Sequence, residues 1–290
     1  MKSYTTLRNL YGSLTQNTLT DNLTFGDQII NDGIRKIIAM PKRWDFLDTT
    51  STTVTVASQS NYKTPYNFDK LYTVTITVGT TKYTVKEAPN REYWDKLQES
   101  TNVTSDTPEW YFLDSGQINF YPAPASSGNT INFNYKQSVR DLSNADYTTG
   151  TVTATNASTT ITGAGTTFTA AMVGRYLKVN ADNFWYKIAS FTNATTIVLD
   201  KAFQGTTVAG AAFTIGEMPI LPESFHDLPV FYAVMMYYTY KITDFKKERD
   251  FAQLWVTGLK DLEAYAGNRS SGVLIEDDSM MQNPNLNVTL

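Results

Sequence analysis

The stretch Leu221–Gly267 constrains the fold more than any other, because it predicts two helices joined by a very short turn. Asp227 can cap the first helix, and Pro229 then falls in the opening turn, where its missing N–H costs nothing. From Val230 to Tyr240 every residue except Thr239 is apolar or aromatic, so this helix has no side suited to water. At about 15 residues it is shorter than the ~20 that a bilayer requires. The rest of the chain or neighbouring copies must therefore bury it.

The second helix of the pair is predicted to be amphipathic. Thr243 or Asp244 can cap its start, and Gly267 is expected to end it. Its apolar residues recur at the spacing of one helix face, namely Phe251, Leu254, Trp255, Gly258, Leu262 and Tyr265.

The N-terminal part predicts two more helices followed by an aromatic anchor. Residues 4–15 form the first, Thr24 caps the second, and Pro41 ends it. The buried stripe of the second helix consists of Ile29, Ile30, Gly33, Ile34, Ile37 and Ile38. The anchor that leaves this helix consists of Trp44, Phe46 and Leu47.

Four cations, Arg35, Lys36, Lys42 and Arg43, gather near the end of the second helix. They have two interpretations, a helix end stabilised through its dipole or a patch that faces DNA. The low overall charge favours the helix end.

Strands are predicted next. Thr52–Ala57 alternates, Leu71–Val78 and Lys82–Lys86 form a hairpin across Gly79-Thr80, and Arg91–Glu99 forms one or two helical turns. A three-strand meander follows, made of Trp110–Leu113, Gln117–Tyr121 and Thr130–Tyr135. Alternation places Ile131, Phe133 and Tyr135 on one face of its third strand.

From Gly150 to Gly216 the composition changes to Thr, Ala and Gly with few charges. Short strands separated by glycines predict a small barrel or sandwich, with strands at Thr151–Ala154, Thr159–Thr162, Tyr176–Val179, Trp185–Phe191, Thr196–Leu199 and Ala212–Ile215. The fold class is therefore α+β. We expect a helical domain with a β-meander in residues 1–149 and 217–290, carrying an inserted all-β domain at 150–216.

Composition narrows the possible functions. The net charge of −4 does not suit a protein that wraps nucleic acid through phosphate contacts. The absence of cysteine excludes disulfides, Cys-ligated zinc and thiol catalysis. No signal peptide or membrane span is predicted.

Chemical motifs are weak, and no enzyme activity, cofactor or metal is predicted. The only histidine, His226, lies beside Asp227 at a helix entrance, where residues adjacent in sequence do not form a catalytic triad. The acidic triplet Glu276–Asp278 lacks the ligand alternation and glycine turn of a calcium loop. GAGTTF is not a phosphate loop because it lacks the GK[ST] ending.

The order of parts resembles the head-to-tail adaptor (connector) proteins of tailed double-stranded DNA bacteriophages. The resemblance rests on IINDGIRKIIAMPKRWDFL, on FLDSGQINFYPAPASSGNTINFNYK and on the late helix pair that opens LPESFHDLPVFYAV. The inserted segment, with TTITGAGTTFTAAMVGRYLKV and YKIASFTNATTIVLDKAFQG, is similar to small β-modules that recur in phage neck and tail proteins.

The resemblance implies a structural protein of the virion neck, made in the host cytoplasm. It further implies a ring of about twelve subunits beneath the portal protein, which meets a tail, nozzle or tail-completion protein and conducts DNA during ejection without sequence-specific or membrane binding. The tail expected to dock into the portal contains Val273, Leu274, Ile275, Met280 and Met281. The expected subunit interface contains Val230, Phe231, Val234, Tyr237 and Tyr238.

Two alternatives belong to other classes. The β segment could recognise carbohydrate or another surface through Trp185 or Tyr186, although strand alternation places one of the pair in the core. The other alternative is a tail-associated hydrolase that acts on cell-wall glycan.

Overall fold

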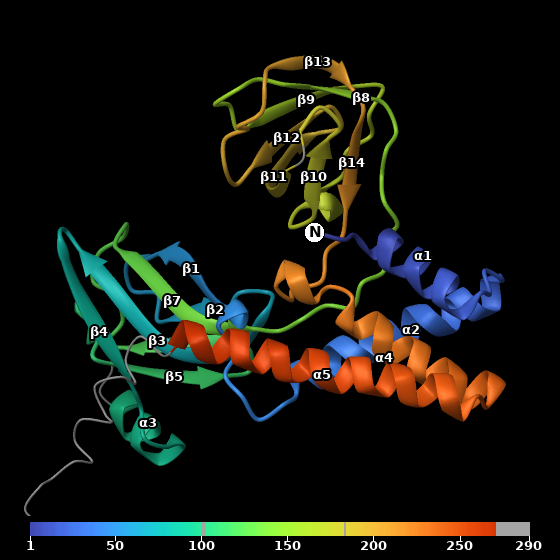
Figure 1. Cartoon of the computed structure of the whole chain (residues 1–290). Coiled ribbons are helices and arrows are strands. Elements are labelled where there is room, and N and C mark those ends of the chain that lie inside the picture. The colour runs from blue at the N-terminus through green and yellow to red at the C-terminus, as the bar shows by residue number, and fades with distance from the viewer. Residues whose placement is uncertain (100–102, 183, 271–290) are drawn as a thin grey trace, which may run out of the picture. The chain divides into compact units, whose positions relative to one another are not determined.

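The computed structural model of the protein describes residues 1–99, 103–182 and 184–270 (Figure 1). The chain forms two compact units, one made of Met1–Lys42 with Asp141–Leu290 and the other of Arg43–Arg140. Each unit contains a seven-stranded sheet, and the first also contains a group of long helices. The predicted mixture of helices and sheets is confirmed. The predicted functional division at residues 150 and 216 stays a prediction.

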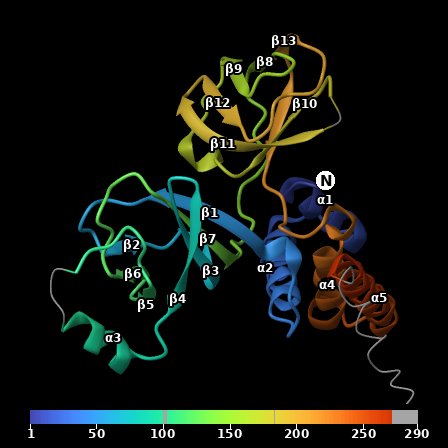
Figure 2. The same ribbon diagram turned by 90° about the vertical axis from the view of Figure 1, so that its left-hand side faces the viewer.

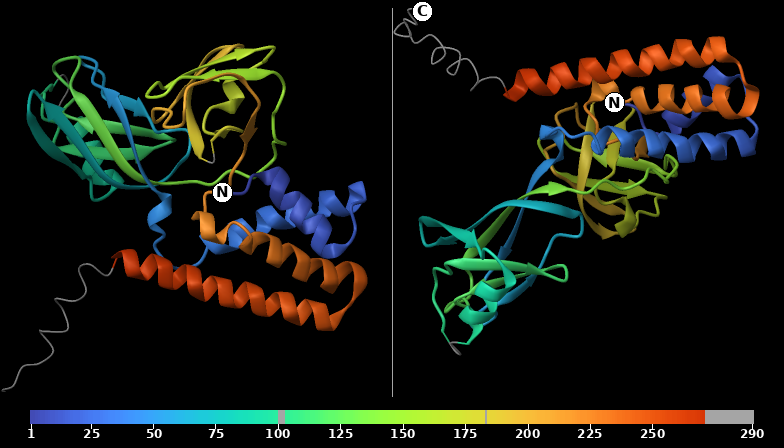
Figure 3. Two further views of the ribbon diagram at one scale, coloured as in Figure 1. Left: turned by 45° about the horizontal axis from the view of Figure 1, so that its top comes forward. Right: turned by 90° about the horizontal axis from the view of Figure 1, so that it is seen from below.

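The helices of the first unit are α1 (Tyr4–Thr15), α2 (Thr20–Ile38), α4 (Leu228–Tyr237) and α5 (Phe245–Ser270). Figure 3 shows α2, α4 and α5 lying side by side along most of their length. Helix α4 packs against α1, α2 and α5. This arrangement satisfies the main constraint of the sequence, because an apolar helix is enclosed by the amphipathic faces of its neighbours.

The helix starts follow the predicted capping only in part. Asp227 stands at the N-cap of α4 as predicted, but its side chain makes no capping hydrogen bond there. The Ser3 hydroxyl accepts a hydrogen bond from the Thr6 N–H and caps α1. Helix α2 begins at Thr20, one turn before the predicted cap Thr24, whose hydroxyl donates to the Thr20 carbonyl at 2.9 Å. The predicted cap was therefore wrong, since a threonine inside a helix can bond back to the preceding turn.

The end of the helix pair also differs from the prediction. Asp244 caps α5, because its Oδ1 accepts hydrogen bonds from the N–H groups of Lys246 and Lys247 at 3.1 Å each. Helix α5 then continues through Gly267 to Ser270, so the predicted stop at Gly267 was wrong. Glycine permits a left-handed helix end but does not impose one.

Two glycines of α2 allow its neighbours to approach closely. A Cβ atom built on Gly26 would lie 2.4 Å from the ring of Tyr11 on α1. A Cβ atom built on Gly33 would lie 3.2 Å from the Cα atom of Pro229 on α4. The contacts of α2 with both helices therefore depend on positions without side chains.

The connection between α4 and α5 is a π-helical turn, Tyr238–Ile242. Thr243 follows in the left-handed conformation, with a φ angle of 57°. The apolar run of the sequence thus extends beyond α4 into a turn. No glycine or proline in the sequence marks the point where the α-helix ends.

The sheet of the first unit is antiparallel and curled, and its strands lie in the order β13-β8-β9-β12-β11-β10-β14 (Figure 2). Their bounds are β8 Thr151–Ala154, β9 Thr160–Ala164, β10 Tyr176–Val179, β11 Trp185–Asn193, β12 Thr196–Leu199, β13 Val208–Ala211 and β14 Phe213–Gly216. All the predicted strand segments are present, and β13 is an additional one. Because the strands form one sheet, the result is closer to the predicted barrel than to a two-sheet sandwich.

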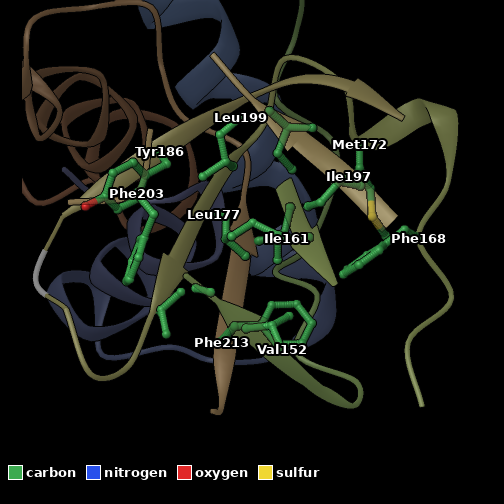
Figure 4. Packing of buried hydrophobic residues seen from close by; sticks show 14 residues of the cluster. Val152, Ile161, Phe168, Met172, Leu177, Tyr186, Ile197, Leu199, Phe203 and Phe213 are labelled. Atoms are coloured by element: carbon green, nitrogen blue, oxygen red, sulfur yellow. The ribbon is translucent and has the colours of Figure 1, made fainter. Parts of the chain in front are cut away.

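The concave side of this sheet holds its own hydrophobic core (Figure 4). Leu177, Ile188 and Ile197 are fully buried, and the aromatic rings of Phe168 and Phe213 pack at 5.9 Å between centroids. Phe168 lies in the segment between β9 and β10, and the others occupy strand positions that face the same side, as the period of two requires for a sheet with one buried face.

The second unit contains the other sheet, with strand order β1-β7-β3-β4-β5-β6-β2. Its strands are β1 Asp48–Val54, β2 Asn61–Lys63, β3 Phe68–Val78, β4 Thr81–Glu87, β5 Trp110–Asp114, β6 Gln117–Tyr121 and β7 Thr130–Gln137. The predicted hairpin across Gly79 is confirmed as β3 and β4, with Gly79 at φ +61°. The helix α3 (Arg91–Gln98) is also confirmed.

The predicted meander is only partly correct. Strands β5 and β6 pair as a hairpin, but β7 pairs with β1 and β3 at the other side of the sheet. The third strand was wrongly placed because a long connection with two prolines, Pro122 and Pro124, leads the chain away from β6. The prediction that Ile131, Phe133 and Tyr135 share a buried face is confirmed.

Candidate functional site

The predicted interface residues of the apolar helix lie mostly inside the chain. Val230, Val234, Tyr237 and Tyr238 are buried, and Phe231 is partly exposed. The chain's own α1, α2 and α5 surround this helix. The chain itself therefore covers most of this helix. Whether these five residues contribute to an interface stays a prediction.

The aromatic residues of α4 and of the π-helical turn after it make specific contacts with the other helices. Tyr237 packs edge-on against Tyr11 at 6.2 Å between ring centroids, and Tyr238 donates a hydrogen bond to the Leu14 carbonyl at 3.3 Å. The ring centroids of Phe231 and of Phe251 on α5 lie 6.4 Å apart. A helix without polar side chains is thus held by neighbouring rings and by the hydroxyls of its tyrosines.

The predicted portal-docking residues lie outside the described residues. These are Val273, Leu274, Ile275, Met280 and Met281.

An exposed apolar group at one end of the helices was not predicted. We call it the turn patch, and its members with their exposed fractions are Leu19 (72%), Tyr240 (71%), Ile242 (55%) and Phe245 (64%). Leu19 belongs to the α1–α2 connection, Tyr240 and Ile242 to the α4–α5 connection, and Phe245 opens α5. Both connections lie at the same end of the helices (Figure 3). Large exposed apolar side chains grouped together indicate a contact surface.

The two connections of the turn patch are tied to the helices. The Asn17 side-chain amide donates to the Tyr237 hydroxyl at 3.4 Å, and the Lys241 ammonium lies 5.3 Å from the centre of the Phe25 ring. These contacts therefore hold both connections of the turn patch against the helices. The sequence contained one hint of it, since the apolar run continues past the point where three neighbouring helices can cover it.

A cleft of about 370 Å³ lies on the outer face of β10 and β11 and beside the chain that follows β12. Its lining consists of Met1, Tyr176, Phe184, Trp185, Tyr186, Lys187, Asp200, Lys201 and Gln204. Burial raises the pKa of the Tyr176 hydroxyl, and the nearby Asp200 carboxylate raises it further. Of the pair singled out in the sequence, Tyr186 belongs to the core and Trp185 faces the cleft, as strand alternation requires.

The basic residues near the end of α2 interact within the chain. Arg35 pairs with Asp32 at 2.5 Å and also with Asp141, and the Lys36 ammonium lies 5.7 Å from the centre of the Tyr232 ring. Both cations lie in the last turn of α2, where they favour the helix dipole.

The other two cations of this group also have internal partners. Lys42 donates a hydrogen bond to the Glu263 carbonyl at 2.8 Å. Arg43 pairs with Asp48 at 2.7 Å and lies 4.9 Å from the centre of the Tyr72 ring. These contacts favour the helix-end interpretation over a patch that faces DNA.

The single histidine holds the N-terminus in place. Its Nδ1 accepts a hydrogen bond from the Lys2 N–H at 3.1 Å, and its Nε2–H donates to the Leu221 carbonyl at 3.0 Å. His226 is buried, and desolvation lowers its pKa from the ordinary value of 6.5. Both ring nitrogens are engaged by backbone, so the imidazole serves a structural role that joins residues far apart in the sequence.

Other kinds of site are missing from the described part of the chain. Within residues 1–99, 103–182 and 184–270, no group of three or more His, Cys, Asp or Glu side chains could hold a metal ion. None of the helices in these ranges combines the length and hydrophobicity of a membrane span.

Comparison with known proteins gives one family. The family model that matches the chain is described as SU10 adaptor protein, and the match covers residues 3–165, more than half of the 290 residues. The matched range contains α1, α2, the whole second unit and the strands β8 and β9. None of the curated proteins compared with the chain matches it.

Proposed function

Because the chain belongs to the SU10 adaptor protein family, we propose that it is a subunit of a ring that connects the capsid portal to the tail and continues the DNA channel. The family is one of structural adaptor proteins of phages, which makes the chain a virion component that interacts with other virion proteins. The predicted resemblance to phage adaptors is confirmed at this level. We further propose that the subunits form a ring, that the ring lies in the virion neck, and that it takes part in DNA ejection.

The observation that carries the proposal is the turn patch. Tyr240, Phe245 and Leu19 are each more than half exposed, although they are large and apolar. Burying a phenylalanine-sized side chain is worth about 1.5–3 kcal/mol, so a partner that covers these residues gains substantial free energy. We propose that the turn patch contacts a neighbouring subunit or the portal protein.

A closed ring accounts for the rest of the proposal. The neighbouring subunits of a ring meet through different surfaces of the same chain, and the contact closes when the rotation between copies divides a full turn. We propose about twelve copies, which the resemblance to head-to-tail adaptors implies. The tail with Val273–Ile275 and Met280–Met281 is proposed to dock into the portal, and a tail-completion or nozzle protein is proposed to bind on the opposite side.

The charge distribution supports DNA passage without DNA binding. The chain has a net charge of −4, and the cations gathered near the end of α2 already have internal partners. DNA affinity depends on free Lys and Arg side chains that replace counterions on phosphates. We propose that the channel wall formed by this protein repels DNA weakly and lets it slide.

Mass photometry of the protein, alone and mixed with its portal protein, tests the proposal. We expect a mostly monomeric protein alone and a ring bound to the portal in the mixture, and end-on negative-stain images should count its subunits. A mixture in which the two proteins stay separate would contradict the proposal.

Two variants separate the proposed contacts. Truncation after Ser270 should abolish portal docking while leaving thermal unfolding nearly unchanged. Tyr240→Ala should weaken ring formation by roughly tenfold, as for an aromatic residue at the centre of an interface. Tyr66→Ala, at a residue that is 80% exposed in the other unit, is the matched control and should assemble normally. If Tyr240→Ala assembles like the control, the turn patch is not the contact surface.

A further inference from the structure

The cleft on β10 and β11 has no place in the proposed ring, and its lining is unusual for a sheet surface. Strand register places Tyr176 opposite Lys187 and Lys178 opposite Trp185. These residues alternate with Leu177 and Tyr186, which point into the core. Their side chains therefore share the outer face of the sheet. Aromatic rings on this face do not contribute to the hydrophobic core.

Two of the aromatic rings at the cleft are accessible. Phe184 is 65% exposed, and Trp185 is half-buried with the Lys178 ammonium 6.0 Å from the centre of its ring. The core of the sheet is already complete through Tyr186 and Phe203. A structural role therefore does not explain Phe184 and Trp185, whereas a ligand with an apolar face would cover them.

The polar residues of the cleft include positive and negative charges as well as hydrogen-bond donors and acceptors. Asp200 offers a carboxylate acceptor, Lys201 an ammonium donor and Gln204 an amide that is both. Within residues 103–182 and 184–270, none of these three side chains has a hydrogen-bond or ion-pair partner. They are free to bind a ligand.

The wall between these groups is held rigidly. The Tyr186 hydroxyl donates to Asp182 Oδ2 at 2.6 Å and accepts from the Gln204 N–H at 3.1 Å. The ring of Tyr186 also packs against Phe203 at 5.3 Å between centroids. The chain around residue 204 is thereby fixed to β11, so a ligand need not organise the site when it binds.

We propose that this cleft binds an uncharged saccharide, with its ring stacked on Trp185 and its hydroxyls bonded to Asp200, Lys201 and Gln204. A sugar hydroxyl donates and accepts at once and therefore suits a lining of mixed sign. The apolar C–H face of a pyranose matches the indole ring of Trp185, which lines the cleft. The volume of about 370 Å³ lies within the range of ~300–1,000 Å³ typical of small-molecule sites.

An anionic ligand fits less well. A phosphate-rich chain, whether a nucleic acid or an acidic glycan, would meet Lys187 and Lys201 in the lining but also the Asp200 carboxylate, in a protein of net charge −4. Such a ligand would gain most of its affinity from lysines and lose it with salt. This contrast gives the test two separate readouts, which are the type of glycan and the effect of salt.

The test is a glycan array of neutral and anionic bacterial oligosaccharides probed with the full-length protein, followed by titration of a bound oligosaccharide monitored by tryptophan fluorescence. We expect neutral glycans to bind, with an affinity unchanged between low and high salt. Trp185→Ala should weaken binding by roughly tenfold, and Trp185→Phe should retain most of it. Tyr66→Ala, which removes an exposed aromatic ring outside the cleft, should bind like the wild type.

Three results would overturn this proposal. They are an array without any bound glycan, binding that Trp185→Ala leaves unchanged in a variant with wild-type circular dichroism, and binding restricted to anionic glycans and lost at high salt. The proposal does not depend on the ring, since a Trp185→Ala protein should still bind the portal.

Discussion

The contact between α1 and α2 allows a quantitative test of the helical core. Gly26 of α2 lies against Tyr11 of α1, and a Cβ atom at Gly26 would be 2.4 Å from two atoms of the Tyr11 ring. Carbon atoms in contact normally lie about 3.5–4.0 Å apart. In Gly26→Ala, the ring or the helix must therefore move by about an ångström.

The Tyr11 ring has little freedom to move. It is fully buried, its hydroxyl donates to Asn22 Oδ1 at 2.9 Å, and Tyr237 packs edge-on against it. Asn22 is itself held by the Thr15 hydroxyl at 3.1 Å. Overpacking costs about 1–3 kcal/mol, and this site belongs at the upper end. Replacing a helical glycine by alanine returns about 1 kcal/mol. We expect the free energy of unfolding to fall by about 2 kcal/mol.

Urea unfolding monitored by circular dichroism at 222 nm measures this change. Gly12→Ala on α1 is the matched control, because the one tight contact of its Cβ would be the Leu23 methyl group at 3.1 Å, the end of a flexible and partly exposed side chain. Its other neighbours, at 3.5 and 3.7 Å, would be in ordinary van der Waals contact. The control should be as stable as the wild type or more stable by up to about 1 kcal/mol. If Gly26→Ala matches the stability of Gly12→Ala with an unchanged m value, the helices are not packed through Gly26 as described.

Two further predictions concern the helix pair. The pKa of His226 is lowered in the folded protein. Folding stability should therefore be highest above the ordinary pKa of 6.5 and should fall as the pH drops below it. The reason is that the unfolded chain then binds a proton that the folded chain does not bind as readily. His226→Gln should flatten the stability profile below pH 6.5, and an unchanged slope would contradict the assignment. Phe231→Asp should lower thermal stability and ring assembly together, since Phe231 is partly buried on α4, whereas Lys246→Glu on exposed α5 surface should change neither. A well-folded, assembly-competent Phe231→Asp protein would exclude a central role for this side of α4.

Local patterns in the sequence predicted most of the elements. Alternation found most strands of both sheets, although it missed β2 and β13 and placed β1 too late, at Thr52–Ala57. The hairpin at Gly79 followed from its turn residues. The same alternation correctly required that only one of Trp185 and Tyr186 enter the core. The helix pair was recognised from capping residues and apolar spacing. These features depend on neighbours within a few residues, so a single chain segment contains the information.

The pairing of distant segments could not be obtained in this way. Strand β7 carries the expected buried face, but its partners β1 and β3 lie far away in the sequence. His226 has ordinary neighbours in the sequence, and its partner Lys2 lies at the opposite end of the chain. Each of these contacts depends on how the chain closes on itself, which local periodicity does not encode.

The apolar run Val230–Tyr240 separates what the sequence determines from what depends on the tertiary structure. The sequence by itself determined that Val230–Tyr240 has no face for water and must be covered. Only the tertiary structure decided that the chain's own α1, α2 and α5 cover α4, and that Tyr240 remains exposed on the turn. Composition sets how much apolar surface a segment has to bury. The arrangement of its neighbours decides which part stays open for a partner, because burial is a property of the assembled surface and not of the segment.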